Sequence, residues 1–174
     1  LLITLKGKPV TTAHEWMVVR RPEILNLLEE NIYGRIPASL PCYSVDRISQ
    51  EPVFGYAIRK QLTLNFRQNG RELHVGVLMY LPQQSTAVPV FLGYNFGGNQ
   101  TVSDDPGIRI TDSWVPNDPA AGITDNRANE NSRGNQQERW QVEKILAAGY
   151  GLVTLYYGDV DPDRNDFSDG VHPL

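Results

Sequence analysis

The chain has 174 residues, of which 40% are hydrophobic and 21% charged, and a formal net charge of −4. This composition is ordinary for a globular protein, and its net negative charge gives no indication of nucleic acid or an anionic membrane surface as a partner. Cys42 is alone in the sequence, so an internal disulfide and a cysteine-based zinc site are excluded. No apolar run reaches the length of a membrane-spanning helix.

The N-terminal half of the sequence predicts a helix followed by two strands. Residues 22–32 carry an apolar stripe with a proline in the first turn and a glycine soon after the end, which predicts a helix. Residues 56–66 and 72–81 alternate between apolar and polar side chains and predict antiparallel strands. Asn69 and Gly70 lie between the two runs, and this pair is the strongest short-range signal for a hairpin turn.

The rest of the chain predicts a strand, a helix and a second strand. The apolar run 88–96 predicts a strand covered on both faces, and the polar connection 100–138 is long enough to be functional or mobile. Residues 138–148 predict a helix, 151–157 a buried strand, and 158–166 an acidic loop. These elements form a βαβ unit, which together with the hairpin predicts a mixed α/β sheet.

Glycines and amides directly follow the first of these buried strands, in the stretch FLGYNFGGNQT. In open α/β sheets, ligands bind beyond the carboxyl ends of the strands, and both irregular loops of this chain leave such an end. The N–H groups of Gly97, Gly98 and Asn99 could therefore face an oxyanion, whereas the plainer alternative is a turn that ends a strand. The sequence has no glycine motif for phosphate binding.

Other polar residues give weaker indications. Asp159, Asp161 and Asp163 alternate as at the start of a calcium loop, but the glycine and the closing glutamate of an EF-hand are missing, so a solvated loop is favoured and no metal is expected. Trp114 lies in a polar loop, where it either stacks on a sugar or pins the loop. No serine lies in a nucleophile elbow and each histidine is isolated, so the sequence has no recognisable nucleophile. Arg139 could reach back to the strand-end crevice.

Several segments together resemble the glucuronoyl esterases, the 4-O-methyl-glucuronoyl methylesterases of carbohydrate esterase family 15. The resemblance keeps the order of the family's segments and covers nearly the whole chain. It rests on EW at 15–16, RRPEILNLLEENIYGRIP at 20–37, FLGYNFGGNQT at 91–101, SDDPGIRITDSWV at 103–115, SRGNQQERWQVEKILAAGYGLVTLYYGDVDPD at 132–163 and DGVHPL at 169–174.

The resemblance implies an α/β-hydrolase-like three-layer sandwich, of which residues 1–174 would be the N-terminal portion of a single catalytic domain. It implies a metal-independent, cofactor-free serine esterase that cleaves glucuronate esters between xylan and lignin alcohols. The family's serine, histidine and acid lie downstream of the matched segments. The resemblance therefore assigns no catalytic residue to this chain, and we expect the chain alone to be inactive, with the remainder of its own catalytic domain as partner.

The resemblance assigns only part of a cleft wall. Phe96, Gly97, Gly98 and Asn99 match the family's strand-end loop, and Arg139 matches the start of a family helix. These residues are the predicted substrate-binding residues. The family more often has histidine at the position after that asparagine, so a role specific to that histidine is not transferred.

Two other functions remain open at the level of sequence. One is an acetyl-xylan or other carbohydrate esterase of the same fold, because fold does not determine substrate. The other is a non-catalytic carbohydrate-binding or interaction domain, which would need protected sheet edges. For the esterase we expect instead an exposed edge or apolar face beside the strand 151–157. We also expect a secreted or periplasmic protein whose targeting peptide has been removed, since residues 1–5 are too short for a signal sequence.

Overall fold

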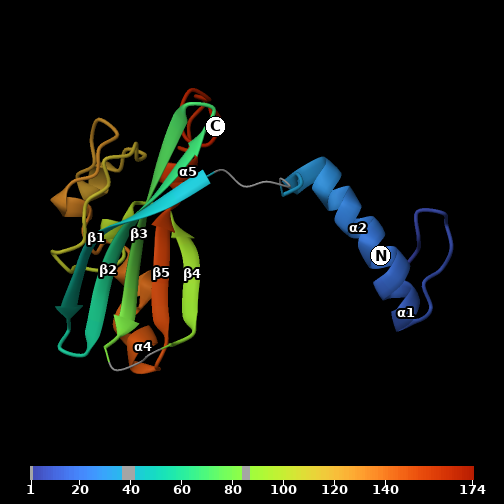
Figure 1. Ribbon diagram of the computed structural model, residues 1–174, viewed down its shortest axis with the longest axis horizontal. Coiled ribbons are helices and arrows are strands. Elements are labelled where there is room, and N and C mark those ends of the chain that lie inside the picture. The colour runs from blue at the N-terminus through green and yellow to red at the C-terminus, as the bar shows by residue number, and fades with distance from the viewer. Residues whose placement is uncertain (1, 37–41, 84–86) are drawn as a thin grey trace. The chain divides into compact units, whose positions relative to one another are not determined.

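The computed structural model describes residues 2–36, 42–83 and 87–174. The chain forms two compact units, residues 1–40 and 41–174 (Figure 1). Among the described residues, no helix is both long enough and apolar enough to cross a bilayer.

The unit formed by residues 1–40 contains a helical run that starts earlier than the sequence predicted. Thr12 caps it: its hydroxyl accepts a hydrogen bond from the Glu15 N–H at 3.1 Å, and the Glu15 carboxylate accepts one from the Thr12 N–H at 3.1 Å. This reciprocal capping box satisfies N–H groups that a helix start leaves unpaired. The run comprises α1 (Ala13–Glu15), the π-helical η1 (Trp16–Arg20), α2 (Arg21–Leu28) and the π-helical η2 (Glu29–Tyr33).

The prediction of a helix over 22–32 was thus right in type but wrong at its start. Pro22 lies at the start of α2, but the helical run continues on its N-terminal side through the wider turn of η1. The predicted stop is confirmed, because Gly34 follows η2 with φ of 73°, a conformation that glycine adopts without a steric penalty.

The unit formed by residues 41–174 is built on a mixed five-stranded sheet in the order β1-β2-β3-β5-β4 (Figure 1). The pairs β1–β2, β2–β3 and β3–β5 are antiparallel, whereas β4 and β5 are parallel. This arrangement confirms the predicted combination of an antiparallel hairpin with a βαβ unit. The strands are β1 (Cys42–Val53), β2 (Ala57–Gln68), β3 (Arg71–Pro82), β4 (Val90–Asn95) and β5 (Gly151–Tyr156).

The hairpin turn is confirmed, while one strand was missed. Asn69 and Gly70 have φ of 52° and 74°, the two positive values that a tight hairpin turn requires. The missed strand is β1, which pairs along β2 with a register shift between Arg47 and Ser49. The shift inserts an extra residue and breaks the two-residue alternation that reveals a strand in sequence.

β1 and β4 are the two edge strands of the sheet, and β5 lies inside it. The prediction that the 88–96 strand is covered on both faces was wrong, because most of β4 is exposed. The exposed edge or apolar face expected beside residues 151–157 is found at β4, the strand that flanks β5. β5 lies between β3 and β4, and among the described residues the outer edge of β4 has no partner strand. Leu92 of β4 is 70% exposed.

The connections between the later strands contain short helices. The predicted helix over 138–148 is interrupted, because Gln141 has φ of 43° and separates two helices. The predicted acidic loop after β5 begins as a helix. The helices are α3 (Gln137–Trp140), α4 (Val142–Ala147) and α5 (Tyr157–Val160), with 3-10 turns η3 (Asn99–Thr101), η4 (Pro119–Ala121) and η5 (Glu130–Ser132).

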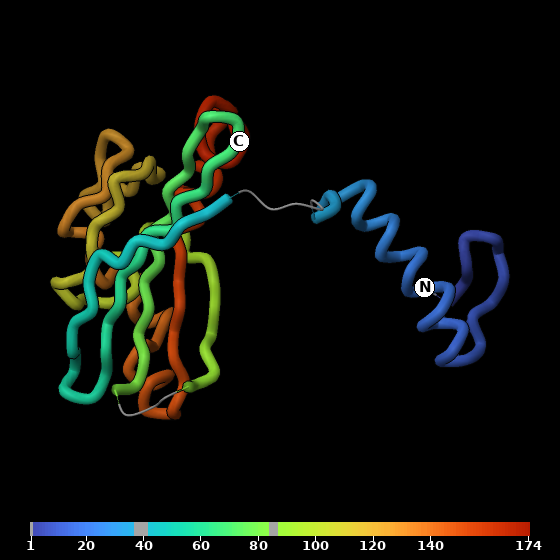
Figure 2. Tube along the Cα trace, in the orientation of Figure 1, coloured from blue at the N-terminus to red at the C-terminus, as the bar shows by residue number. Residues whose placement is uncertain are grey.

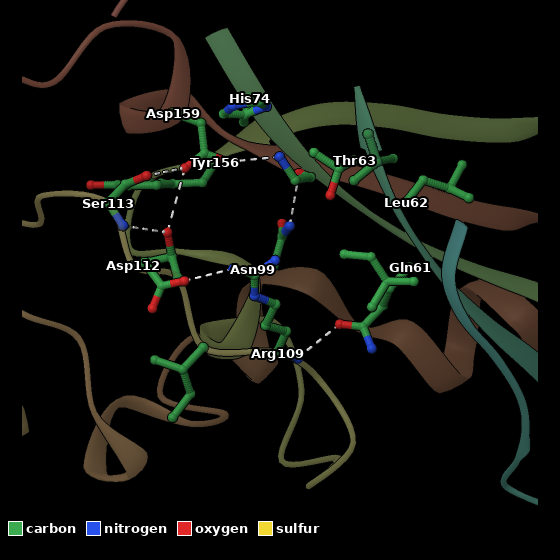
Figure 3. A pocket seen from close by; sticks show the side chains of 15 residues that line it. Gln61, Leu62, Thr63, His74, Asn99, Arg109, Asp112, Ser113, Tyr156 and Asp159 are labelled. Atoms are coloured by element: carbon green, nitrogen blue, oxygen red, sulfur yellow. Dashed lines mark hydrogen bonds and ion pairs between the residues drawn. The ribbon is translucent and has the colours of Figure 1, made fainter. Parts of the chain in front are cut away.

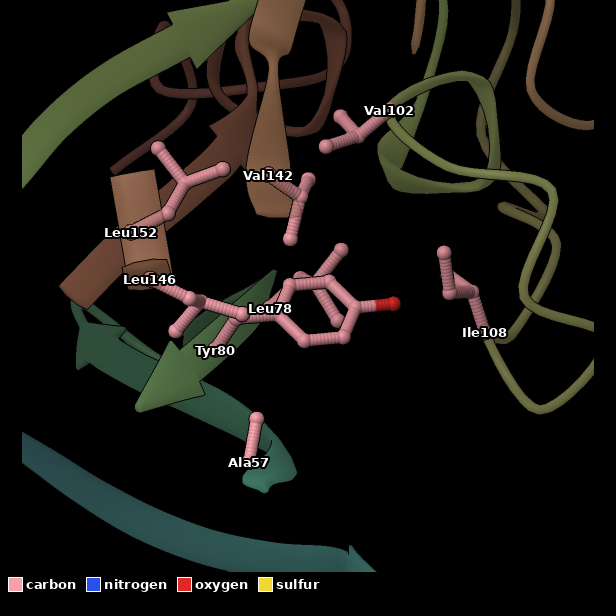
Figure 4. Close-up of a cluster of buried hydrophobic side chains, with 8 residues drawn as sticks. All are labelled: Ala57, Leu78, Tyr80, Val102, Ile108, Val142, Leu146 and Leu152. Carbon is pink, nitrogen blue, oxygen red and sulfur yellow. The ribbon is translucent and has the colours of Figure 1, made fainter. Parts of the chain in front are cut away.

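The core lies between the sheet, α4 and the connection that follows β4. Figure 2 shows the course of this connection along the chain. Val102 and Ile108 belong to it and are buried against strand residues, so the segment is packed and not loose (Figure 4). Burial of such side chains is the main favourable term in folding. The cluster consists of Ala57, Leu78, Tyr80, Val102, Ile108, Val142, Leu146 and Leu152.

A buried ion pair fixes the same connection to β2. The guanidinium of Arg59 donates to the Asp105 carboxylate at 2.5 Å, and both side chains are almost fully buried. The Tyr80 hydroxyl and the Gly107 N–H donate to the same carboxylate at 2.8 and 2.9 Å. A buried charge needs such partners, since an unpaired one would lose its hydration without compensation.

Candidate functional site

The loop after β4 is closed on itself by the side chain of Asn95. The Asn95 amide donates to Asn99 Oδ1 at 2.7 Å and to the Thr154 hydroxyl at 3.0 Å, and its Oδ1 accepts from the Gly98 N–H at 2.8 Å. Gly98 has φ of 97°, and a Cβ there would lie 2.4 Å from an atom of Gln100, so only glycine fits. The loop is therefore a rigid turn at the carboxyl end of a strand.

This geometry defines what the predicted loop residues can offer. The N–H of Gly98 is used inside the loop and is not free to face an oxyanion. The Asn99 amide donates to the Gly76 carbonyl of β3 at 3.0 Å and ties the loop to the sheet. Phe96 points outward with 60% of its surface exposed, and its ring centroid lies 5.2 Å from that of Tyr157, which follows β5. The structure thus brings two aromatic rings together at the carboxyl ends of β4 and β5.

The last predicted site residue, Arg139, is exposed in α3. Its neighbour Trp140 packs against β4, where a Cβ on Gly93 would meet the indole ring at 3.5 Å. The amide nitrogen of Gln136 lies 3.5 Å from where a Cβ on Gly97 would be. The start of α3 therefore flanks the strand-end loop.

A polar pocket of about 330 Å³ lies between the sheet, the strand-end loop and α5 (Figure 3). Sequence reasoning had not brought its residues together, because they come from six separate segments of the chain. Its lining consists of Ile48, Gln61, Leu62, Thr63, His74, Gly76, Val77, Asn99, Arg109, Ile110, Thr111, Asp112, Ser113, Tyr156 and Asp159.

Asp159 is the largely buried acid of this pocket. Its carboxylate accepts hydrogen bonds from the Gly76 N–H at 2.9 Å, the Ser113 hydroxyl at 2.6 Å and the Thr111 hydroxyl at 3.4 Å. Burial raises the pKa of this carboxyl, and the hydrogen bonds only partly oppose that effect, so the pKa lies above its usual value. Asp159 joins β3, the 111–113 segment and α5.

Ser113, His74 and Asp159 line one pocket, yet they do not form a catalytic triad. In a triad the histidine lies between the hydroxyl and the carboxylate. The Ser113 hydroxyl instead donates directly to Asp159, while His74 Nδ1 lies 2.6 Å from Asn65 Oδ1. Within the described residues no histidine nitrogen is hydrogen-bonded to a serine hydroxyl. In this arrangement His74 cannot take the Ser113 proton.

The acidic residues after β5 are directed to different partners. Asp159 faces the pocket, whereas Asp161 Oδ1 lies 3.1 Å from His172 Nε2. Among the described residues, the His, Cys, Asp and Glu side chains form no group of three or more that could hold a metal ion.

Trp114 is held through its backbone. The buried Tyr156 hydroxyl donates to the Trp114 carbonyl at 2.9 Å, which fixes the connection to the end of β5. The Arg164 guanidinium carbon lies over the indole ring, 5.8 Å from the ring centroid. Trp114 also lines a second hollow, which shares residues with the polar pocket. The loop is thus pinned at this position by the Trp114 carbonyl, and the role predicted for the indole ring stays a prediction.

No protein-family model matches the chain. A curated carbohydrate esterase from an unknown prokaryotic organism is 42% identical over 172 residues, which cover 98% of this chain and 40% of the relative. A promiscuous CE15 esterase from a marine bacterial metagenome is 42% identical, with a TM-score of 0.83, over 99% of this chain and 43% of the other. A glucuronoyl esterase from Solibacter usitatus is 40% identical, with a TM-score of 0.83, over 99% and 44%.

These matches establish the fold type of the chain and the proteins to which it is homologous. The mixed sheet and its helices are those of the matched part of CE15 esterases, which are of the α/β-hydrolase type. The chain is a homologue of these carboxylic-ester hydrolases over nearly its whole length, as its sequence segments had indicated. It spans less than half the length of the relatives that it matches.

Proposed function

We propose that the chain is the N-terminal portion of a single α/β-hydrolase domain in a serine esterase that cleaves glucuronate esters between xylan and lignin alcohols. The observation that supports this proposal best is 40% identity to a glucuronoyl esterase over 99% of the chain. The polymeric nature of such a substrate supports a secreted or periplasmic location. The remainder of the domain would supply the serine, the histidine and the acid.

In this proposal the described residues shape the cleft while the remaining part performs the chemistry. The serine would attack the ester carbonyl with the histidine as base, and water would then hydrolyse the acyl-enzyme. Phe96 would form an apolar wall together with Tyr157, because both rings lie at the strand ends. Gly97, Gly98 and Asn99 would act through the shape of their loop.

Arg139 is the proposed charged contact of the substrate. Its side chain is exposed at the start of the helical segment beside the loop, and it forms no ion pair with any other described residue, so the guanidinium can meet an anionic or hydroxylated group. No metal or cofactor enters the proposed reaction.

The test is hydrolysis of a benzyl ester of glucuronic acid by the complete gene product. We expect alcohol release that falls roughly 10³-fold or more when the elbow serine is replaced by alanine. The 174-residue chain should release none, because the triad would lie outside it. Turnover by the 174-residue chain alone, or an undiminished rate in the serine variant, would contradict the proposal.

Hydrolysis of acetylated xylan with no action on glucuronate esters would instead favour another carbohydrate esterase of the same fold. A matched structure described as promiscuous supports keeping this second candidate. The comparison of acetyl and glucuronate esters on one preparation decides between the two substrates.

A further inference from the structure

We propose that the polar pocket of Figure 3 binds a neutral sugar residue of the substrate's carbohydrate chain. The identity of that chain rests on the proposed function, whereas the pocket's preference for a neutral sugar rests on the side chains that line it. In this proposal the ester carbonyl lies at the strand-end loop and the carbohydrate in the pocket, which shares Asn99 with that loop.

The walls of the pocket are fixed before any ligand arrives. The Gln61 amide donates to the Gly107 carbonyl at 2.9 Å and accepts from the Arg109 N–H at 2.7 Å. The Gln61 side chain therefore binds the backbone of the 107–109 segment and fixes that wall of the pocket to β2. Asn99 and Asp159 each bind the backbone of Gly76 and fix the strand-end loop and α5 to β3, which forms another wall of the pocket. A preformed site loses less conformational freedom on binding, which favours affinity.

Several polar groups on these walls have capacity left for a ligand. The Thr63 hydroxyl has no hydrogen-bond partner among the described residues. The Arg109 side chain uses one nitrogen for Asp112 at 2.6 Å and retains further N–H donors. The Asp159 carboxylate has an acceptor position beyond its three protein contacts. The lining thus offers both donors and acceptors, and the hydroxyl groups of a sugar can use both.

The charge of the lining selects a neutral ligand. The lining contains one guanidinium, that of Arg109, the two carboxylates of Asp112 and Asp159, and the imidazole of His74. An acidic sugar would bring a third carboxylate into this set and be repelled, whereas hydroxyl groups can donate to the two acids. The glucuronate part of the proposed substrate is therefore excluded from this pocket.

The size and the apolar part of the lining also suit one sugar ring. A volume of about 330 Å³ is at the small end of the roughly 300–1,000 Å³ range of ligand pockets. Ile48 and Ile110 line the pocket with accessible side chains and supply hydrocarbon surface for the C–H face of a ring. Asn99 belongs both to this lining and to the strand-end loop, so a sugar bound here lies next to the proposed ester cleft.

The experiment is a titration of the 174-residue chain with xylobiose, followed by amide chemical shifts in NMR, with glucuronic acid as the charged comparison. We expect xylobiose to shift the amides of Thr63, Arg109 and Ser113, and glucuronic acid to shift them less. Thr63→Phe, which fills the pocket, should abolish the shifts. Thr63→Val removes only the hydroxyl and should weaken binding by roughly two- to ten-fold, as expected for one hydrogen bond. Thr63→Ser should bind as the parent chain does.

Absence of these shifts up to saturating xylobiose, or tighter binding of glucuronic acid, would overturn the inference. Equal xylobiose binding by Thr63→Val and the parent chain would also count against it, and that variant keeps the test decisive if Thr63→Phe does not fold. The titration needs no ester hydrolysis. Sugar binding without esterase activity would therefore refute the proposed function alone, and esterase activity without sugar binding would refute only the pocket.

Discussion

Asp159 and Asp105 are two carboxylates that folding removes from water, with opposite effects on their pKa values. For Asp159 burial dominates and the pKa is raised. For Asp105 burial also acts to raise the pKa, but hydrogen bonds from Arg59, the Gly107 N–H and Tyr80 outweigh it, so the pKa is lowered. The difference is a cation: Asp105 is paired with a guanidinium, whereas Asp159 accepts only from neutral groups.

The two acids therefore make opposite contributions to stability as pH changes. The raised pKa of Asp159 gives stability that is present below its usual value of 3.8 and is lost as pH rises through the raised pKa. The lowered pKa of Asp105 gives stability that is present above 3.8 and is lost as pH falls through the lowered pKa. We expect carboxyl ¹³C resonances to titrate above 3.8 for Asp159 and below it for Asp105. Assignment by Asp159→Asn and Asp105→Asn is the control, and the reverse order would refute the account.

At the scale of elements, the long connection after β4 is held on the sheet by side chains of β2. Arg59 pairs with Asp105, and Gln61 binds the backbone on both sides of Ile108. Gly107 makes this approach possible, because a Cβ there would lie 2.1 Å from the Arg59 guanidinium. The polar composition of the connection had suggested a functional or mobile loop. Its few buried apolar residues and its contacts with Arg59 and Gln61 nevertheless hold it in place.

Gly107→Ala should therefore disturb the contact between Arg59 and the connection while leaving the rest of the fold unchanged. The added methyl group must displace the buried Arg59 side chain, so we expect the free energy of unfolding to fall by about 1–3 kcal/mol, as in overpacked cores. Denaturant titration measures this. Gly93→Ala is the matched control, since its Cβ would make only an ordinary 3.5 Å contact with Trp140. An equal loss in both variants would show that the effect is not specific to the contact between Arg59 and the connection.

At the scale of the whole molecule, the sheet presents an unpaired edge with apolar side chains. Among the described residues no strand pairs with the outer side of β4, and Leu92 and Tyr94 of this strand are exposed. An apolar edge of this kind is a template for pairing with another strand. In the proposed esterase the edge would be covered by the remaining part of the domain.

The isolated 174-residue chain should accordingly self-associate through β4. We expect the weight-average mass in sedimentation to rise with concentration, and Leu92→Lys to reduce this rise, because a charge on an edge opposes strand pairing. Leu5→Lys replaces a similarly exposed leucine in the unit formed by residues 1–40 and should have no such effect. A monomeric parent chain, or equal effects of the two substitutions, would contradict this prediction.

Much of the fold could be predicted because its signals are local. The β2–β3 hairpin was correct, since alternation and the Asn69-Gly70 turn act within a few residues. β1 was missed because its register shift interrupts the alternation. The early start of the first helix could have been found, since Thr12 and Glu15 have the spacing of a capping box.

The candidate site was less predictable, since its residues are distant in sequence. The strand-end position of residues 96–99 followed from the order of elements. The meeting of Thr63, Ser113 and Asp159 did not, because it depends on how β2, the connection and α5 pack. The hydrogen bond of the Gly98 N–H could not be predicted either. Its acceptor is the side chain of Asn95, three residues away, which could equally have faced solvent.

Periodicity, turn chemistry and matching segments were enough to predict the α/β class, the hairpin, the βαβ unit and the resemblance to CE15 esterases. The positions of β5 inside the sheet and of β4 at its edge depend instead on contacts between distant parts of the chain. Apolar periodicity indicates that a strand is buried, but it does not indicate which strands lie beside it. The same holds for Asp159, whose shifted pKa depends on burial by segments far away in the chain.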